Sequence, residues 1–181
     1  GVLSNWAGAH GCIWASEAEG IANPINDLLQ VEHIVEILKE VKAKVLVTVS
    51  LDDATELGHK VQQISERVPS LEHLILLDNS FTDSRHEKVT TTDFKSAIST
   101  QSSDRLALSS QPKGDDIAMY FHTGGTTGRP KIAKLSHDNI SFVVQVYAGF
   151  NTYHGKSPVL NALPLFHVFG VIAASLSMFI V

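Results

Sequence analysis

Residues 120–131 read Tyr-Phe-His-Thr-Gly-Gly-Thr-Thr-Gly-Arg-Pro-Lys, and the interpretation of the whole chain starts from this stretch. It combines glycines, hydroxyl side chains and cations, namely Gly124, Gly125, Gly128, Thr123, Thr126, Thr127, Arg129 and Lys131. Glycines can adopt positive φ or let a ligand approach the backbone, so successive amide N–H groups can face one anion. Charged donors form stronger hydrogen bonds to an anion than neutral ones do. The composition therefore predicts a loop that holds a polyphosphate.

A tight hairpin without a ligand is the alternative, because Gly and Thr are common in such turns. The crowding of three glycines, three hydroxyls and a lysine into residues 123–131 favours phosphate binding instead. The loop is not a Walker A motif, in which Lys follows the last Gly directly and Ser or Thr follows Lys. Here Arg129 and Pro130 intervene, and Ile132 follows the lysine. The stretch also lacks the dinucleotide fingerprint Gly-x-Gly-x-x-Gly.

Residues 121–131, followed by Ser-His-Asp-Asn at 136–139, resemble the phosphate-binding signature of the adenylate-forming superfamily. This superfamily contains acyl- and aryl-CoA synthetases, peptide-synthetase adenylation domains and firefly-type luciferases. The signature reads roughly Tyr-Thr-Ser-Gly-Thr-Thr-Gly-x-Pro-Lys-Gly, then Thr/Ser-His-x-Asn after a short gap. Gly124 stands where Ser is usual, which removes one hydroxyl donor and leaves the backbone amides. Ile132 stands where Gly is usual, which places a β-branched residue in the returning strand.

A second stretch, Leu163-Pro-Leu-Phe-His167 with Gly170, resembles another superfamily signature, Leu-Pro-x-Phe/Tyr-His-x-x-Gly. Two signatures in the expected order make chance agreement improbable. By this resemblance, His167 lies where the acid substrate meets the nucleotide. The alternative is a buried histidine that is hydrogen-bonded to the backbone and only stabilises the fold. None of the nine histidines belongs to a recognisable metal-binding motif.

The resemblance implies an ATP-dependent acyl- or aryl-CoA synthetase. Some enzymes of this class act in fatty acid metabolism. A carboxylate attacks the α-phosphate of ATP to give acyl-AMP and pyrophosphate, and the thiol of CoA then displaces AMP. The implied phosphate-binding residues are Thr123, Gly124, Gly125, Thr126, Thr127, Gly128 and Lys131, and the implied catalytic residues are His167 and Lys131. A Mg²⁺ ion that bridges the phosphates is implied too. Because the adenine, ribose and metal contacts of the family lie beyond Val181, the isolated chain is expected to be inactive.

Besides a CoA synthetase, the sequence leaves open a peptide-synthetase adenylation domain, a luciferase and a non-catalytic nucleotide-binding module. A peptide-synthetase adenylation domain or a luciferase shares the same signatures. The departures at Gly124 and Ile132 leave room for a non-catalytic nucleotide-binding module. A P-loop NTPase is disfavoured, because the Lys-Ser/Thr step is missing.

The composition indicates a globular protein in a reducing compartment. With 44% hydrophobic and 18% charged residues, the 181-residue chain can form a core of ordinary size. The single cysteine, Cys12, cannot form an intramolecular disulfide, and no basic signal-peptide start is present, so we expect a cytoplasmic location. Residues 1–116 carry 10 Lys and Arg against 18 Asp and Glu, whereas residues 117–181 carry 4 against 1. Four dispersed cations favour a small anionic ligand over nucleic acid.

The periodicity predicts alternating helices and strands, and therefore a layered α/β fold with mostly parallel, doubly wound sheets. Expected helices cover residues 9–19, 31–41, a segment to Val68 that is capped by Asp52 or Asp53, and 139–150. Expected strands cover residues 44–49, 73–77, 117–123 and 158–162. Residues 168–181 are predicted to form a buried helix, since 14 residues are too few for a membrane span of about 20.

We expect two consecutive subdomains, residues 1–114 and 115–181. The first would end in a polar surface excursion, residues 79–114, with a short helix near residues 92–99 that Asp93 caps. We also expect the chain to be a piece of a larger protein, because it stops within an apolar run and superfamily members are more than twice as long.

Overall fold

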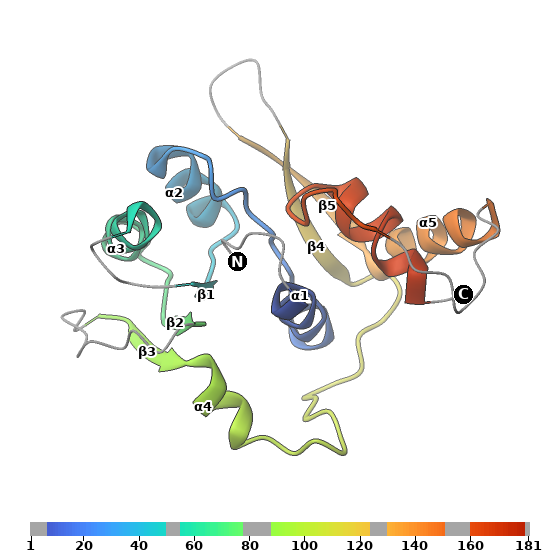
Figure 1. The fold of residues 1–181 in the computed structure, drawn as a ribbon, viewed down its shortest axis with the longest axis horizontal. Helices are drawn as coiled ribbons and strands as arrows, with labels where there is room; N and C mark the ends of the chain where they lie inside the picture. The colour runs from blue at the N-terminus through green and yellow to red at the C-terminus, as the bar shows by residue number, and fades with distance from the viewer. Residues whose placement is uncertain (1–6, 50–54, 78–87, 124–129, 151–159, 180–181) are drawn as a thin grey trace. The chain divides into compact units, whose positions relative to one another are not determined.

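The structure is a computed structural model, and it describes residues 7–49, 55–77, 88–123, 130–150 and 160–179 (Figure 1). The chain divides into two compact units. The first contains residues 1–3, 25–107 and 122–131, and the second contains residues 4–24, 108–121 and 132–181. The units are thus interleaved along the sequence, whereas the sequence suggested the consecutive segments 1–114 and 115–181.

The first unit is built on a parallel sheet of three strands, β1 (Val45–Thr48), β2 (His73–Leu76) and β3 (Thr90–Asp93), in the order β1-β2-β3. Val45 pairs with His73, which in turn pairs with Thr90. Leu46, Leu74 and Leu76 are almost completely buried, as expected for strands of a covered parallel sheet. The predicted mixed α/β fold with parallel strands is confirmed.

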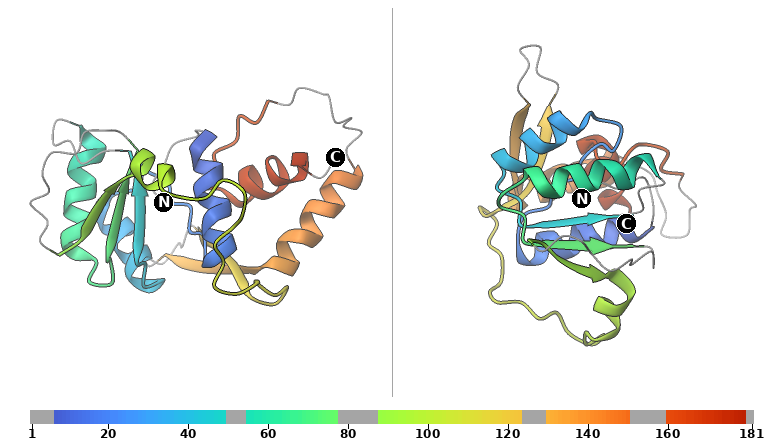
Figure 2. Two further views of the ribbon diagram at one scale, coloured as in Figure 1. Left: turned by 90° about the horizontal axis from the view of Figure 1, so that it is seen from below. Right: turned by 90° about the vertical axis from the view of Figure 1, so that its left-hand side faces the viewer.

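Two amphipathic helices, α2 (Val31–Glu40) and α3 (Glu56–Arg67), pack against each other and cover one face of this sheet (Figure 2). The buried side of α2 consists of Val31, Ile34, Val35, Ile37 and Leu38. The N-cap of α3 is Thr55, whose Oγ1 accepts a hydrogen bond from the Gly58 amide at 3.0 Å. The prediction of Asp52 or Asp53 as the cap was therefore wrong, although both residues lie outside the described ranges. Thr55 does what either aspartate would have done, since all three side chains can accept from the first turn.

The polar segment after β2 contains a strand that the sequence did not predict. Residues 79–114 were expected to be a surface excursion, yet β3 pairs in parallel with β2 and completes the sheet. Threonines form this strand readily, because β-branched side chains suit the pleated backbone. The short helix that follows, α4 (Phe94–Ser99), begins as predicted: the Asp93 carboxylate accepts from the Ser96 amide at 2.8 Å.

In the second unit, helix α1 (Ala7–Glu19) is attached to a strand from the other half of the sequence. That strand, β4 (Ile117–Thr123), runs into the first unit at its end. Ala22, just after the helix, forms a parallel bridge with Met119. The Ala22 amide donates to the Ala118 carbonyl and the Tyr120 amide donates to the Ala22 carbonyl, both at 2.8 Å. These two bonds explain why α1 groups with residues 108–121.

The second unit continues through β5 (Lys131–Ser136), helix α5 (His137–Phe150), a π-helical turn η1 (Phe169–Ala173) and a 3₁₀ turn η2 (Leu176–Phe179). Ile140 and Val144 of α5 are buried. Val143 and Phe150, which are also apolar, are 40% and 85% exposed. The helix is apolar around most of its circumference, so the periodicity alone could not select the packed side.

The C-terminal segment is not the single helix that its apolar composition predicted. It is divided into η1 and η2. Ser175 and Ser177 are buried within it, and the Ser177 hydroxyl donates to the Ala173 carbonyl. Residues 160–162 form no strand, in contrast to the prediction for residues 158–162, whose first two residues lie outside the described ranges. In the part of the chain that the structure describes, no helical segment combines the length and hydrophobicity that a lipid bilayer requires.

Candidate functional site

The glycine-rich loop lies between two hydrogen-bonded strands, as predicted. β4 and β5 form a two-stranded sheet, and such a short connection makes it an antiparallel hairpin. Residues 124–129, which include Gly124, Gly125, Thr126, Thr127 and Gly128, lie outside the described ranges, so the prediction that they bind phosphate is not examined by the structure.

Thr123 and Lys131 mark the two ends of this loop, and the structure brings them together. The Thr123 Oγ1 hydroxyl donates to the Lys131 carbonyl oxygen at 3.4 Å. Both side chains are exposed, and no ion pair among the described residues involves the Lys131 ammonium group. The charge of Lys131 is therefore available to an anion from solution.

The residues after the hairpin, Ser136 to Asn139, form a reciprocal helix cap. The Ser136 amide donates to the Asn139 Oδ1 atom at 3.1 Å, and the Asn139 amide donates to the Ser136 Oγ atom at 3.2 Å. This arrangement is a capping box with Asn at the third helical position. Ser136 is therefore the cap of α5, whereas Asp138 lies within the first turn. The second half of the first signature thus fixes where β5 ends and α5 begins.

A turn at residues 113–116 holds the start of α5 against the start of β4. The His137 amide donates to the Asp116 carbonyl at 3.1 Å, and the Asp138 amide donates to the Gly114 carbonyl at 2.8 Å. A Cβ atom on Gly114 would lie 2.5 Å from the Asp138 Cγ atom, so a larger residue there would require the exposed Asp138 side chain to move. The start of β4 and the end of β5 are therefore held together by this turn.

The second signature is interlocked through backbone contacts. The His167 amide donates to the Pro164 carbonyl at 3.1 Å. A Cβ atom on Gly170 would lie 2.9 Å from the Pro164 carbonyl carbon, which excludes any larger residue without movement of the backbone. The Asn161 side chain joins the two ends: its Nδ2 donates to the Gly170 carbonyl, and its Oδ1 accepts from the Leu163 amide, each at 3.1 Å.

His167 lies in a turn before η1 rather than at the end of a strand, and its side chain is exposed. The buried histidine that was the alternative interpretation is therefore not observed. Nδ1 accepts a hydrogen bond from the Phe169 amide at 3.2 Å. Because Nδ1 is the acceptor, a neutral imidazole carries its proton on Nε2. All of these contacts lie within residues 161–171.

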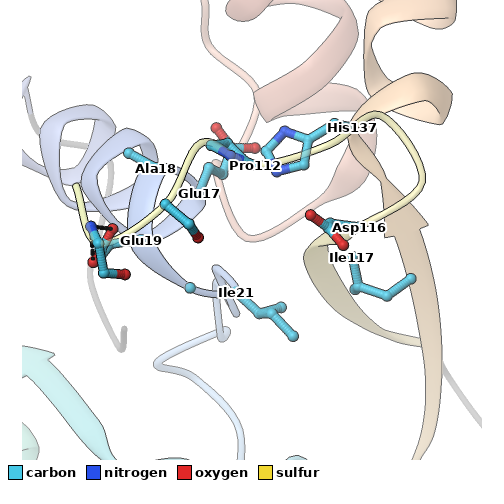
Figure 3. A pocket seen from close by; sticks show the side chains of 11 residues that line it. Glu17, Ala18, Glu19, Ile21, Pro112, Asp116, Ile117 and His137 are labelled. Carbon is cyan, nitrogen blue, oxygen red and sulfur yellow. Dashed lines mark hydrogen bonds between the residues drawn. The ribbon is translucent and has the colours of Figure 1, made fainter.

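The second unit also contains a pocket that the sequence reasoning missed (Figure 3). It has a volume of about 190 Å³ and lies between the C-terminal end of α1 and the segment before β4. Its lining consists of Glu17, Ala18, Glu19, Gly20, Ile21, Ser109, Ser110, Pro112, Asp116, Ile117 and His137. Neither the loop ends nor His167 contribute to it. Within the described ranges, no group of three or more His, Cys, Asp or Glu side chains could hold a metal ion.

The pKa values of two carboxyl groups in this pocket, those of Glu17 and Glu19, differ from their ordinary values in opposite directions. Burial raises the pKa of Glu17 from 4.5 to about 7, because water is partly withdrawn from the charged form. Hydrogen bonds from Ser109 lower the pKa of Glu19, and its two carboxylate oxygens accept from the Ser109 amide at 2.9 and 3.2 Å. The sequence did contain a signal for Glu17. Ala9, Ile13 and Glu17 are spaced by four residues, so Glu17 lies on the same side of α1 as the buried Ala9 and Ile13.

Comparison with known proteins shows a family over nearly the whole chain. Residues 9–181 match the model of the family described as AMP-binding enzyme. The marinolic acid–CoA ligase of Pseudoalteromonas sp. (strain SANK 73390) is 33% identical over 170 residues, which cover 91% of this chain and 25% of that enzyme. A long-chain-fatty-acid–CoA ligase of Bacillus subtilis is 34% identical over 82 residues, 44% of this chain and 15% of that enzyme. The chain thus spans about a quarter of the length of the first of these relatives.

Solved structures show the same fold. ATP-bound MatB from Rhodopseudomonas palustris matches with a TM-score of 0.70 and 21% identity, over 97% of this chain and 32% of that protein. A putative long-chain-fatty-acid CoA ligase from the same organism matches with a TM-score of 0.76 and 19% identity, over 97% and 40%. The fold is therefore that of the matched part of acyl-CoA-synthetase-like proteins. Together with the family match, the two sequence signatures lead to one conclusion: this chain belongs to the AMP-binding enzyme family.

Proposed function

We propose that the chain is part of a longer ATP-dependent acyl- or aryl-CoA synthetase and that the β4–β5 loop binds the β- and γ-phosphates of ATP. The observation that carries this proposal is the pair of loop ends: Thr123 and Lys131 are joined by a hydrogen bond, and both side chains remain exposed. CoA ligases among the relatives support the same assignment.

The reaction has two steps. A carboxylate oxygen of the acid attacks the α-phosphorus of ATP, the bond to the β-phosphate oxygen breaks, and pyrophosphate leaves. The thiolate sulfur of CoA then attacks the acyl carbon of acyl-AMP, and AMP leaves with the electron pair of the broken bond. In the first step, negative charge grows on the departing pyrophosphate, and the Lys131 ammonium group would stabilise it there. A Mg²⁺ ion would supply further charge neutralisation on the phosphates.

We assign His167 to the acid substrate. Its Nδ1 atom is already occupied by the Phe169 amide, so the neutral ring presents an Nε2–H donor. This donor can hold a carboxylate oxygen of the acid without the cost of a buried charge. The interlocked Pro164–Gly170 backbone would keep the ring in place, since a site works best when its supporting shell is rigid.

The test is ATP–pyrophosphate exchange by the longer parent protein with a panel of carboxylic acids. Lys131→Ala should lower exchange about ten- to a hundred-fold, because one charged hydrogen bond is worth about 1.5–3 kcal/mol. The matched control is Lys134→Ala, which removes another exposed lysine of the same strand and should change exchange little. Equal losses in both variants would refute a formed phosphate site. ATP binding without exchange for any acid would show a nucleotide-binding module instead of an enzyme.

A further inference from the structure

Asn161 lies just before the second signature and closes it with one side chain. Its Nδ2 atom donates to the Gly170 carbonyl, and its Oδ1 atom accepts from the Leu163 amide, each at 3.1 Å. Leu163 and Gly170 are the first and the last residue of the signature, and His167 lies between them. A single amide group therefore links the two ends of the segment that carries His167.

The two contacts require both halves of an amide side chain. A backbone carbonyl only accepts and a backbone N–H group only donates, so the partners of Asn161 determine which atom is Oδ1 and which is Nδ2. Asp would keep the acceptor for Leu163 but would place a second acceptor against the Gly170 carbonyl. Ala would lose both contacts. Because Gly170 is buried, water cannot easily replace the donor that its carbonyl would lose.

The contact at Gly170 is one residue away from the group that holds the His167 ring. Phe169 directly precedes Gly170, and its amide donates to His167 Nδ1 at 3.2 Å. Gly170 in turn lies against the Pro164 carbonyl, which also accepts from the His167 amide at 3.1 Å. The position of the Phe169 amide relative to the ring thus depends on where Gly170 is held.

The His167 side chain is exposed, so burial does not fix its orientation. The hydrogen bond at one ring nitrogen of a histidine determines which tautomer the other nitrogen presents. We propose that Asn161 is a positioning residue for His167: by closing residues 163–170, it keeps the Phe169 amide on Nδ1 and leaves the Nε2–H group for the acid substrate. The role in acid binding rests on the proposed function, whereas the tautomer of the ring does not.

The first experiment is a double-mutant cycle for ATP–pyrophosphate exchange by the parent protein, with Asn161→Ala, His167→Ala and both together. Asn161→Ala should lower kcat/KM for the acid about ten- to a hundred-fold, because a small misplacement of a substrate-binding group has effects of this size. The KM for ATP should stay nearly unchanged. In the His167→Ala background, Asn161→Ala should have almost no further effect, since it acts through the ring.

The matched control is Asn26→Ala. The Asn26 Oδ1 atom accepts from the Leu28 amide at 3.0 Å, the same local turn that Asn161 makes with Leu163. Its loss should change kcat/KM for the acid by no more than about twofold, as is usual for a residue outside a binding site. Asn161→Asp keeps the local turn and removes only the donor to Gly170, so it should resemble Asn161→Ala. It also provides the same test if Asn161→Ala fails to fold.

The second experiment reads the tautomer directly and needs no activity. The ¹⁵N chemical shifts of labelled histidines in the parent are measured at about pH 8, where an imidazole is ordinarily neutral. The His167 signals are identified by their loss in His167→Ala. In the unsubstituted protein, Nδ1 should be unprotonated and Nε2 protonated. In Asn161→Ala both shifts should move toward the average of the two tautomers, whereas Asn26→Ala should leave them in place.

Additive losses in the double-mutant cycle would overturn the inference, because they would show that Asn161 acts independently of His167. A fall of the acid and ATP parameters by the same factor, together with a lower melting temperature, would indicate a general structural role and overturn it too. So would an unchanged His167 tautomer in Asn161→Ala. If no acid supports exchange in the unsubstituted parent, the proposed function is refuted, and the tautomer measurement alone decides whether Asn161 positions the ring.

Discussion

Replacing Glu17 by Gln should stabilise the second unit at pH 8 and hardly change it at pH 5. Glu17 lies in the wall of the pocket, half-buried, and burial raises its pKa from 4.5 to about 7. The folded state therefore binds a proton more tightly than the unfolded state does. For such a group, stability is greatest at low pH and falls as the pH rises from about 4.5 to about 7. Gln keeps the shape of the protonated acid and cannot ionise.

The size of the effect follows from the shift. Each tenfold change in the ionisation constant is about 1.4 kcal/mol, so a change from 4.5 to about 7 corresponds to at most about 3 kcal/mol at pH 8. Because the carboxylate keeps part of its contact with water, solvent screening reduces the expected gain for Glu17→Gln to about 1–2 kcal/mol. At pH 5 the folded carboxyl group is protonated and the unfolded one is already partly ionised, so only a small part of the pH 8 difference remains.

The assay is urea unfolding at pH 5 and pH 8, followed by circular dichroism, with the ¹³C chemical shift of the Glu17 carboxyl group measured across the same range. Glu19→Gln is the matched control. Hydrogen bonds from Ser109 lower the pKa of Glu19 below 4.5. The contribution of Glu19 to stability is therefore complete above about pH 4.5 and constant between pH 6 and pH 8. If Glu17 titrates near 4.5, or if both variants show the same pH dependence, the assignment of a desolvated carboxyl group is incorrect.

The remaining predictions concern the two signatures. In the parent protein, His167→Ala should leave ATP binding and the melting temperature nearly unchanged while acyl-AMP formation falls; a melting temperature several degrees lower, with normal adenylation by the folded fraction, would remove His167 from the site. Ser136→Ala and Asn139→Ala should each lower stability in urea unfolding by about 0.5–2 kcal/mol, and the double variant should lose less than the sum, because the two side chains form one reciprocal cap. Gly170→Ala should destabilise by about 1–3 kcal/mol, whereas Gly149→Ala, where nothing lies within 4 Å, should be neutral or stabilising in the same measurement.

The regular elements with distinct boundaries were predictable from the sequence. β4 was located to the residue, because an uninterrupted strand pattern lies between Asp116 and the first glycine of the loop. The strand β3 was missed since its threonines stand in a long polar stretch, and its pairing with β2 is a tertiary contact. The cap of α3 was assigned to the wrong residue because Asp and Thr are comparable caps and local sequence cannot choose between them.

The candidate site was predictable only in part. The loop ends and His167 came from the signatures, and their exposure agrees with a role in binding. Glu17 was missed because its partial burial is a tertiary effect: the pocket that it lines is completed by residues such as Pro112 and Ile117, about a hundred residues further along the sequence. The apolar character of α5 was visible in the sequence, but the pattern did not select the side that packs against η1 and η2.

The structure separates the signature residues into two physical classes, and this separation bears on the departure at Ile132. Ser136, Asn139 and Gly170 form caps and close backbone contacts, whereas Thr123 and Lys131 leave their side chains exposed at the loop. Ile132 belongs to the first class, because it lies within β5 and is half-buried there. A β-branched side chain favours the strand in which glycine would weaken it. The substitution therefore stiffens the stem of the hairpin and removes no donor from the loop, so a loss of phosphate binding does not follow from it.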